Sequence, residues 1–69
     1  MKTLDVVALE KDFPKEGLRR GQVGTIVESM TPGVFLVEFA DLQGQTYAFL
    51  TVGQSDLLLL HHRPALKVA

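Results

Sequence analysis

The stretch LRRGQVGTIV, residues 18–27, decides the fold of this chain. Gly21 and Gly24 lie where a polar loop passes into a run of β-branched residues. Glycine adopts positive φ without strain and lets another backbone come close. Inside a strand it usually marks a bulge or a bend. Because a sheet of few strands must coil sharply to close, the stretch predicts the first bend of a small β-barrel.

Turn residues between apolar runs predict an all-β fold. Proline or glycine recurs at roughly the 8–12-residue spacing that is typical of such folds, and no window favours a helix of ordinary length. Five strands are expected, at residues 4–9, 22–29, 34–40, 46–52 and 57–61. Residues 10–21 form a long first loop, Pro32-Gly33 suits a type II turn, 41–44 form a hairpin loop, and 53–56 form a short helical turn. This order describes a five-stranded SH3-like small barrel.

The length and composition predict one small domain without a metal or a cofactor. The chain has 69 residues and no cysteine, which excludes disulfides and thiolate metal sites. His61 and His62 are adjacent, and adjacent residues on a strand point to opposite faces, so the pair is poorly placed to chelate one ion. We assign residues 1–64 to a single domain and residues 65–69 to a flexible tail.

The alternation of side chains along two of the expected strands predicts an exposed apolar cluster. Glu38 shares a face with Val34 and Leu36, so Phe35, Val37 and Phe39 should point inward. In the next strand Ala48, Leu50 and Val52 should point inward, and Tyr47, Phe49 and Thr51 outward. An apolar cluster of Val34, Leu36, Tyr47 and Phe49 is large for the outside of a monomer. It is either covered by the tail or the long loop, or it is an interface.

The leucine run at residues 57–60 strengthens the prediction of an interface. A strand of a small barrel has one inner face, so about two of these four leucines need cover from elsewhere. Leu58 is therefore added to the expected partner-binding residues.

Combinations of residues that indicate catalysis are scarce. Ser29 and Ser55 lie outside a Gly-x-Ser-x-Gly elbow. The acidic residues in and beside the first loop lack the spacing of a calcium loop. The segment 17–21 lacks the Gly-Lys-Ser/Thr of a phosphate-binding loop. We expect no enzymatic activity and no catalytic residues.

The first loop is expected to carry a small basic cluster at its tip, which allows a second kind of contact. Arg19 and Arg20, with Lys15 nearby, lie beside Phe13 and could touch an acidic partner or RNA phosphate. A duplex-binding protein needs a basic face that neutralises phosphates. The net charge of this chain is −1, so binding to nucleic acid is disfavoured.

Three segments, DVVAL at 5–9, GLRRGQVGTIV at 17–27 and VEF at 37–39, resemble a known bacterial family. Its members are small stand-alone proteins, frequent in cyanobacteria, that are catalogued as a domain of unknown function. The resemblance runs from about residue 5 to residue 60. It implies an SH3-like barrel, and it brings no established activity and no functional residues. More distantly, residues 21–27 are similar to the KOW motif of ribosomal and transcription proteins. With Asp56-Leu57 they are also similar to small SH3-like subunits of photosynthetic electron-transfer complexes.

We expect a non-catalytic protein-interaction module that self-associates or binds a larger protein through the sheet face. The expected contact residues are Val34, Leu36, Tyr47, Phe49 and Leu58. Two alternatives stay open. One is a KOW-like module that contacts nucleic acid through Phe13, Arg19 and Arg20. The other is an antitoxin or immunity protein encoded beside its partner.

The sequence also predicts a cytoplasmic location. Charged residues interrupt the N-terminal segment, so no signal peptide is expected. No stretch approaches the roughly 20 apolar residues of a membrane helix. The lack of cysteine fits the reducing cytosol.

Overall fold

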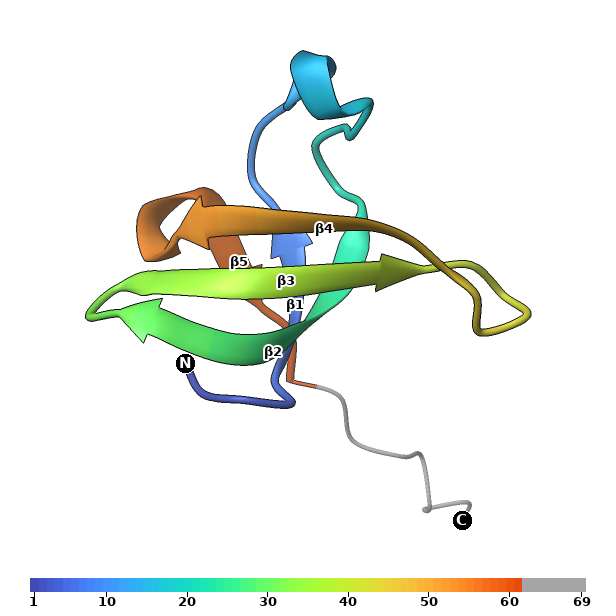
Figure 1. Cartoon of the computed structure of the whole chain (residues 1–69). Helices are drawn as coiled ribbons and strands as arrows, with labels where there is room; N and C mark the ends of the chain where they lie inside the picture. The colour runs from blue at the N-terminus through green and yellow to red at the C-terminus, as the bar shows by residue number, and fades with distance from the viewer. Residues whose placement is uncertain (62–69) are drawn as a thin grey trace, which may run out of the picture.

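The computed structural model describes residues 1–61, which form a five-stranded antiparallel sheet (Figure 1). The elements are β1 (Val6–Leu9), η1 (Pro14–Glu16), β2 (Val23–Thr31), β3 (Val34–Ala40), β4 (Thr46–Gly53), η2 (Gln54–Asp56) and β5 (Leu57–Leu59), where η denotes a short 3₁₀ helix. The strand order is β4-β3-β2-β1-β5. The all-β class and the short helical turn before the last strand are thus confirmed.

The sheet coils into an SH3-like barrel that stays open along one side. In Figure 1, β1 and β5 lie behind β3 and β4, and the long β2 curves from one layer into the other. Within residues 1–61, β4 and β5 are the two edges of the sheet and do not pair with each other. The core between the layers consists of Val7, Leu9, Leu18, Ile26, Phe35, Val37, Phe39, Val52 and Leu57. The inward positions predicted for β3 are confirmed.

The two glycines of the opening stretch serve the bend in different ways. Gly21 has φ of +92°, the left-handed conformation that glycine adopts without strain. At Gly24 a Cβ atom would lie 2.7 Å from Cγ1 of Val37 and 2.8 Å from the carbonyl oxygen of Glu38. Gly24 is therefore the point at which the backbone of β2 packs closely against β3.

Bulges give β2 the extra coil that the barrel needs. Its register with β3 shifts between Ile26 and Glu28 and again between Ser29 and Thr31. A bulge bends a strand and increases its twist. The β2–β3 hairpin then closes through Pro32-Gly33, and Gly33 has φ of +78°, as a type II turn requires.

The first strand is shorter than the sequence predicts, and the second runs further. The amide of Asp5 donates to the carbonyl oxygen of Lys2 over 3.0 Å, and Leu4 has φ of +78°. A tight turn thus occupies residues 2–5, and β1 begins at Val6 instead of Leu4. Strand β2 begins at Val23 and runs on to Thr31, two residues past the predicted end.

The last strand is shorter than the sequence predicts. Strand β5 ends at Leu59 instead of His61. The predicted tail at residues 65–69 and the end of the predicted domain lie outside the described residues. Among residues 1–61 there is no helix with the length and apolar character needed to cross a membrane.

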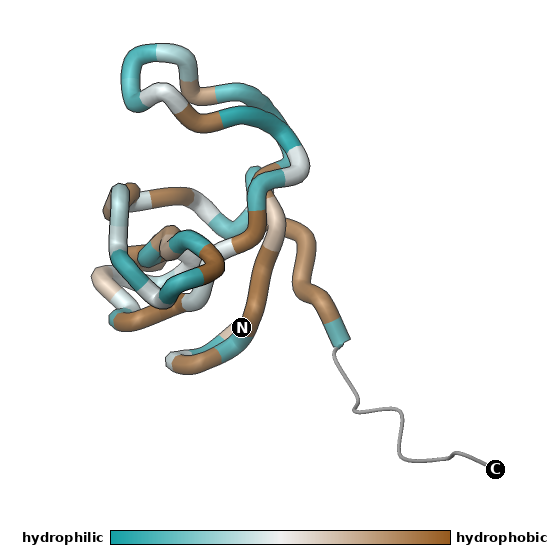
Figure 2. Tube along the Cα trace, turned by 90° about the vertical axis from the view of Figure 1, so that its right-hand side faces the viewer, coloured by the Kyte–Doolittle hydropathy of each residue, from teal (hydrophilic) through white to brown (hydrophobic). Residues whose placement is uncertain are grey.

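The long first loop is more ordered than predicted. It contains η1 at its tip, and the two arms below η1 form a bridge between Phe13 and Leu18. Figure 2 shows this loop at the top, mainly in teal and white, whereas long brown segments follow the strands. Leu18 is the exception, because its side chain is only 2% exposed and belongs to the core.

Candidate functional site

Three apolar side chains share the outside of the β3–β4 hairpin. Strict alternation turns Val34 and Leu36 away from the core, and both are partly buried by their neighbours. Phe49 lies in the middle of β4 and is 56% exposed. We refer to Val34, Leu36 and Phe49 as the outer apolar face.

The strand register sets what surrounds this face. Each of its members has a polar or small residue opposite it: Glu38 opposite Phe49, Thr51 opposite Leu36, and Gly53 opposite Val34. Phe49 and Leu36 are therefore diagonal neighbours, a spacing that an aromatic ring can bridge. Because Gly53 has no side chain, Val34 is left open on the β4 side.

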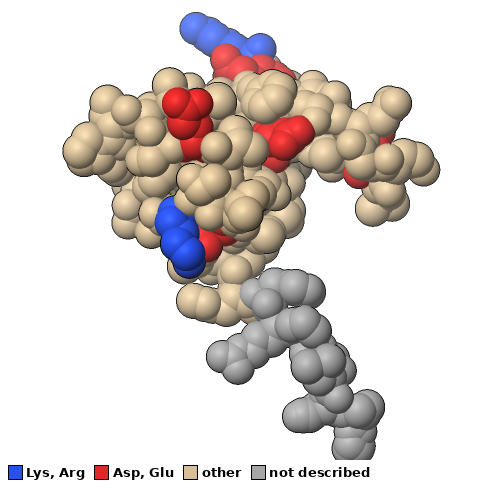
Figure 3. Space-filling view, turned by 60° about the horizontal axis from the view of Figure 1, so that its bottom comes forward, with Lys and Arg blue, Asp and Glu red and all other residues tan. Residues whose placement is uncertain are grey.

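Two carboxylates border the outer apolar face. Glu28 lies opposite Leu36 on the β2 side, and Glu38 accepts a hydrogen bond from the hydroxyl of Thr46. Figure 3 shows separated acidic groups on a mostly uncharged surface, and the Lys and Arg side chains in that view each lie next to an acidic group. The face is apolar at its centre and acidic at its margin.

Tyr47 is exposed as predicted, but it does not extend the outer apolar face. Phe39 pairs with Ala48 and Ala40 pairs with Thr46, so Tyr47 is the additional residue of a bulge. Its ring centroid lies 6.5 Å from that of the buried Phe39. Its hydroxyl accepts a hydrogen bond of 3.0 Å from Nε2 of Gln22. The bulge breaks the alternation, and Tyr47 covers the end of the barrel beside the first loop.

Leu58 is exposed at the other edge of the sheet, far from Phe49 in strand order. It pairs with Ala8, which in turn pairs with Val23. Leu58 is 50% exposed and Val23 is 49% exposed. The leucine run therefore contributes to a second apolar row, across β5, β1 and β2. Within the leucine run, Leu57 is buried, Leu58 is exposed, and Leu59 and Leu60 are partly buried.

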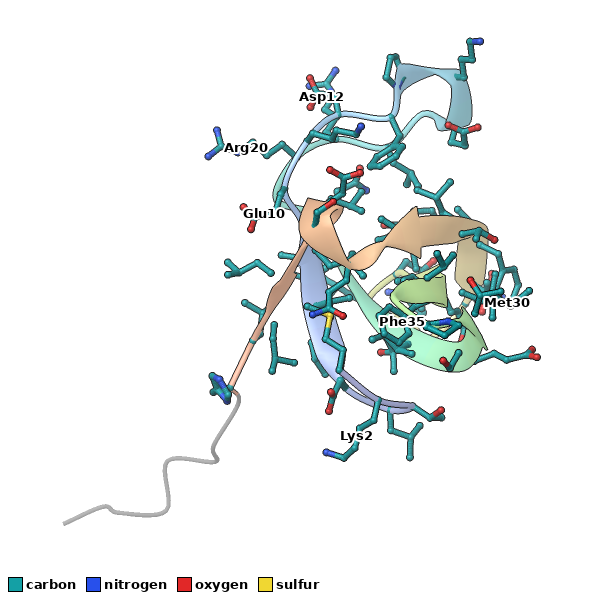
Figure 4. All side chains as sticks on the ribbon, turned by 90° about the vertical axis from the view of Figure 1, so that its left-hand side faces the viewer. Lys2, Glu10, Asp12, Arg20, Met30 and Phe35 are labelled. Carbon is teal, nitrogen blue, oxygen red and sulfur yellow. The ribbon has the colours of Figure 1, made fainter. Side chains whose placement is uncertain are left out.

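The residues predicted for loop contact divide into one structural residue and two exposed ones. Phe13 is partly buried and packs against the core. Arg19 and Arg20 are exposed on the returning arm of the loop, below the tip where they were predicted, because η1 forms the tip. The backbone N–H of Arg20 donates to Oδ1 of Asp12 over 2.8 Å, so a carboxylate lies beside the basic pair. Figure 4 shows the Arg20 side chain pointing into solvent.

Contacts between the first loop and η2 were missed by the sequence reasoning. The ammonium of Lys11 lies 5.3 Å from the centroid of the Phe13 ring and 3.4 Å from Oδ2 of Asp56. The amide of Glu10 also donates to the carbonyl oxygen of Asp56 over 2.8 Å. Asp56 is 45 positions from Lys11 and 46 from Glu10 in the chain, and no motif links them. They fix the loop arm against the end of the sheet.

The comparison with protein families matches residues 3–59 to a family described as Domain of unknown function (DUF4926). The match covers most of the chain. The chain belongs to this family. No curated protein and no solved structure matches it.

Membership of DUF4926, a domain of unknown function, assigns no role to any side chain. Within residues 1–61, no group of three or more His, Asp or Glu side chains gathers as metal ligands would. The carboxylate of Asp5 accepts a hydrogen bond of 2.8 Å from the backbone N–H of Lys2. This bond, with the nearby Lys2 ammonium, lowers the pKa of Asp5 from its ordinary 3.8. It belongs to the turn that precedes β1.

Proposed function

We propose that this DUF4926 protein is a non-catalytic interaction module whose outer apolar face binds another protein. The observation that carries the proposal is the 56% exposure of Phe49 in mid-strand, next to Leu36 and Val34. A large aromatic side chain left exposed on a sheet loses the free energy that its burial would supply. Aromatic anchors surrounded by smaller apolar groups are typical of the centres of protein interfaces.

The residues at the margin of the outer apolar face indicate which chemical groups a partner would present. Glu28 and Glu38 border the apolar centre, and the residues that pair with its three members include no Lys or Arg. Rim charges steer association and select partners more than they add affinity. The proposed partner therefore has an apolar centre bordered by Lys, Arg or free N–H groups. As part of this proposal we place the module in the cytoplasm, because the chain lacks cysteine.

The proposal is tested by matched charge substitutions on the two apolar surfaces. We expect Leu36→Glu and Phe49→Glu to abolish copurification of a partner with the tagged chain from its native cells. Leu58→Glu, at similar exposure on β5, should leave that copurification unchanged. Far-UV circular dichroism should show that all three variants fold. Equal loss in all three variants, or loss in Leu58→Glu alone, contradicts the proposal.

Contact with nucleic acid through Arg19 and Arg20 is the weaker proposal. Residues 10–21 contain four basic and three acidic residues, so the loop has almost no excess charge. Binding through phosphates weakens steeply as salt rises. If the loop binds RNA, Arg19→Ala should reduce that salt dependence. Absence of binding at low salt removes this alternative.

A further inference from the structure

We infer that the free edge of β4 pairs with β4 of a second copy of this chain. Within residues 1–61, β4 has a hydrogen-bonded neighbour on one side only, which is β3. An edge strand exposes a row of backbone N–H and C=O groups that can accept another strand. This inference goes beyond the proposed function, because it rests on the backbone edge of β4 and not on the outer apolar face.

The edge of β4 lacks the usual protection against pairing. Proteins protect edge strands with charged side chains, with proline, with bulges or by keeping the strand short. The sequence of β4, TYAFLTVG, spans eight residues and contains no charge and no proline. Its register is irregular only at Tyr47, near its start. The opposite edge, β5, has three residues and is protected by its shortness.

The absence of charge favours a second copy as the occupant. Antiparallel pairing about a two-fold axis places a strand opposite itself, so each charge on it would approach the same charge on the partner. In β4 no such repulsion arises. The same symmetry keeps the outward side chains of both strands on one face of the joined sheet.

The regular part of β4 sets the register. The bulge at Tyr47 and its hydrogen bond to Gln22 occupy the first end of the strand. Residues 48–53 remain. Gly53 is also the N-cap of η2, so we take residues 48–52 as the regular part of the strand, with Leu50 at its centre. We therefore place Leu50 opposite Leu50 of the second copy and Phe49 opposite Thr51 of the second copy. In this arrangement the two outer apolar faces join into one surface.

The test introduces a positive or a negative charge at Thr51, an exposed position of β4. Wild-type protein at micromolar concentration should sediment with twice the mass of one chain. Thr51→Lys and Thr51→Glu should each sediment as one chain, because the two Thr51 side chains are diagonal neighbours in the proposed register. An equimolar mixture of the two variants should recover the double mass. Leu58→Lys, on the opposite edge, should keep the double mass.

Wild-type protein that sediments as one chain at every concentration overturns the inference. So does a Thr51→Lys variant that keeps the double mass, or a mixture that stays monomeric. None of these results affects the proposed function, which is decided by Leu36→Glu on β3. Conversely, a failure of the copurification experiment does not decide the inference, because the mass of the purified chain is measured without the partner.

Discussion

At the scale of single residues, Gly24 is the position where the barrel tolerates no side chain. The nearest atoms to an added Cβ include a backbone oxygen at 2.8 Å, which cannot rotate away. We expect Gly24→Ala to lower the free energy of unfolding by about 2 kcal/mol or more, as overpacking of a core does. Urea denaturation measures this change.

Gly53 provides the matched control for Gly24, because an added Cβ there meets no atom within 4 Å and the residue does not need positive φ. Gly53→Ala should change the unfolding free energy by less than about 1 kcal/mol. Equal destabilisation by the two variants would show that the β2–β3 approach is not the reason for Gly24.

Leu4 is the residue at which the turn before β1 is strained. It has φ of +78° and its side chain is 75% exposed, so it adopts a conformation disfavoured for leucine and buries little surface. The left-handed conformation costs a residue with a Cβ roughly 1–2 kcal/mol, and the greater entropy of unfolded glycine offsets part of this. We expect Leu4→Gly to raise the melting temperature by a few degrees. Leu4→Val, which keeps a Cβ and adds branching, should lower it.

Asp5 makes the stability of this turn depend on pH. Its pKa in the folded protein lies below the ordinary 3.8, so the carboxylate stabilises the fold above the unfolded pKa. That contribution is lost as the pH falls from about 3.8 through the folded pKa. Urea denaturation between pH 6 and pH 2 should show a smaller loss of stability for Asp5→Asn than for wild type over this window. Parallel curves would contradict the assignment.

At the scale of elements, the first loop is fixed to the barrel through Phe13. Its ring packs on the core beneath the Lys11 ammonium, and Lys11 also pairs with Asp56 of η2. Truncation of a partly buried aromatic ring costs a substantial part of the roughly 3–5 kcal/mol seen for full burial. We expect Phe13→Ala to destabilise the fold by about 2 kcal/mol, and Arg19→Ala to have an effect within about 0.5 kcal/mol. Thermal unfolding of the two variants separates the structural residue of this loop from the exposed one.

The strands could be predicted from the sequence where alternation is regular. Phe35, Val37 and Phe39 alternate with Val34, Leu36 and Glu38, and the burial of β3 follows that pattern. The same rule predicted that Tyr47 is exposed, but it gave no sign of the bulge there, because a bulge depends on the register between two strands and leaves no local signal. The turn at Leu4 was missed for a similar reason, since leucine gives no sign of positive φ.

The candidate site was predictable only in part. The outward positions of Val34, Leu36 and Phe49 follow from strand parity. Their separation from Leu58 does not, because it depends on the strand order, which places β4 and β5 at opposite edges. The contact of Lys11 with Asp56 likewise depends on how the ends of the barrel meet. Single-sequence patterns carry no information on such long-range pairings.

At the scale of the whole molecule, β4 carries both proposed contacts. Phe49 contributes to the outer apolar face, and the backbone of the same strand forms the free edge. Pairing along the edge would place two outer apolar faces side by side, so a dimer could engage two partner molecules. Bivalent binding raises apparent affinity without new contacts when the geometry permits both to engage. The second apolar row, around Leu58, lies outside this surface.

Photocross-linking from single positions tests most directly whether the outer apolar face is the working surface. A photoreactive phenylalanine analogue replaces Phe49 in one chain and Leu58 in another, and both chains are irradiated in their native cells. We expect position 49 to give a discrete adduct with another protein, which Leu36→Glu abolishes, and position 58 to give none. An adduct from position 58 together with none from position 49 would contradict the assignment of the working surface.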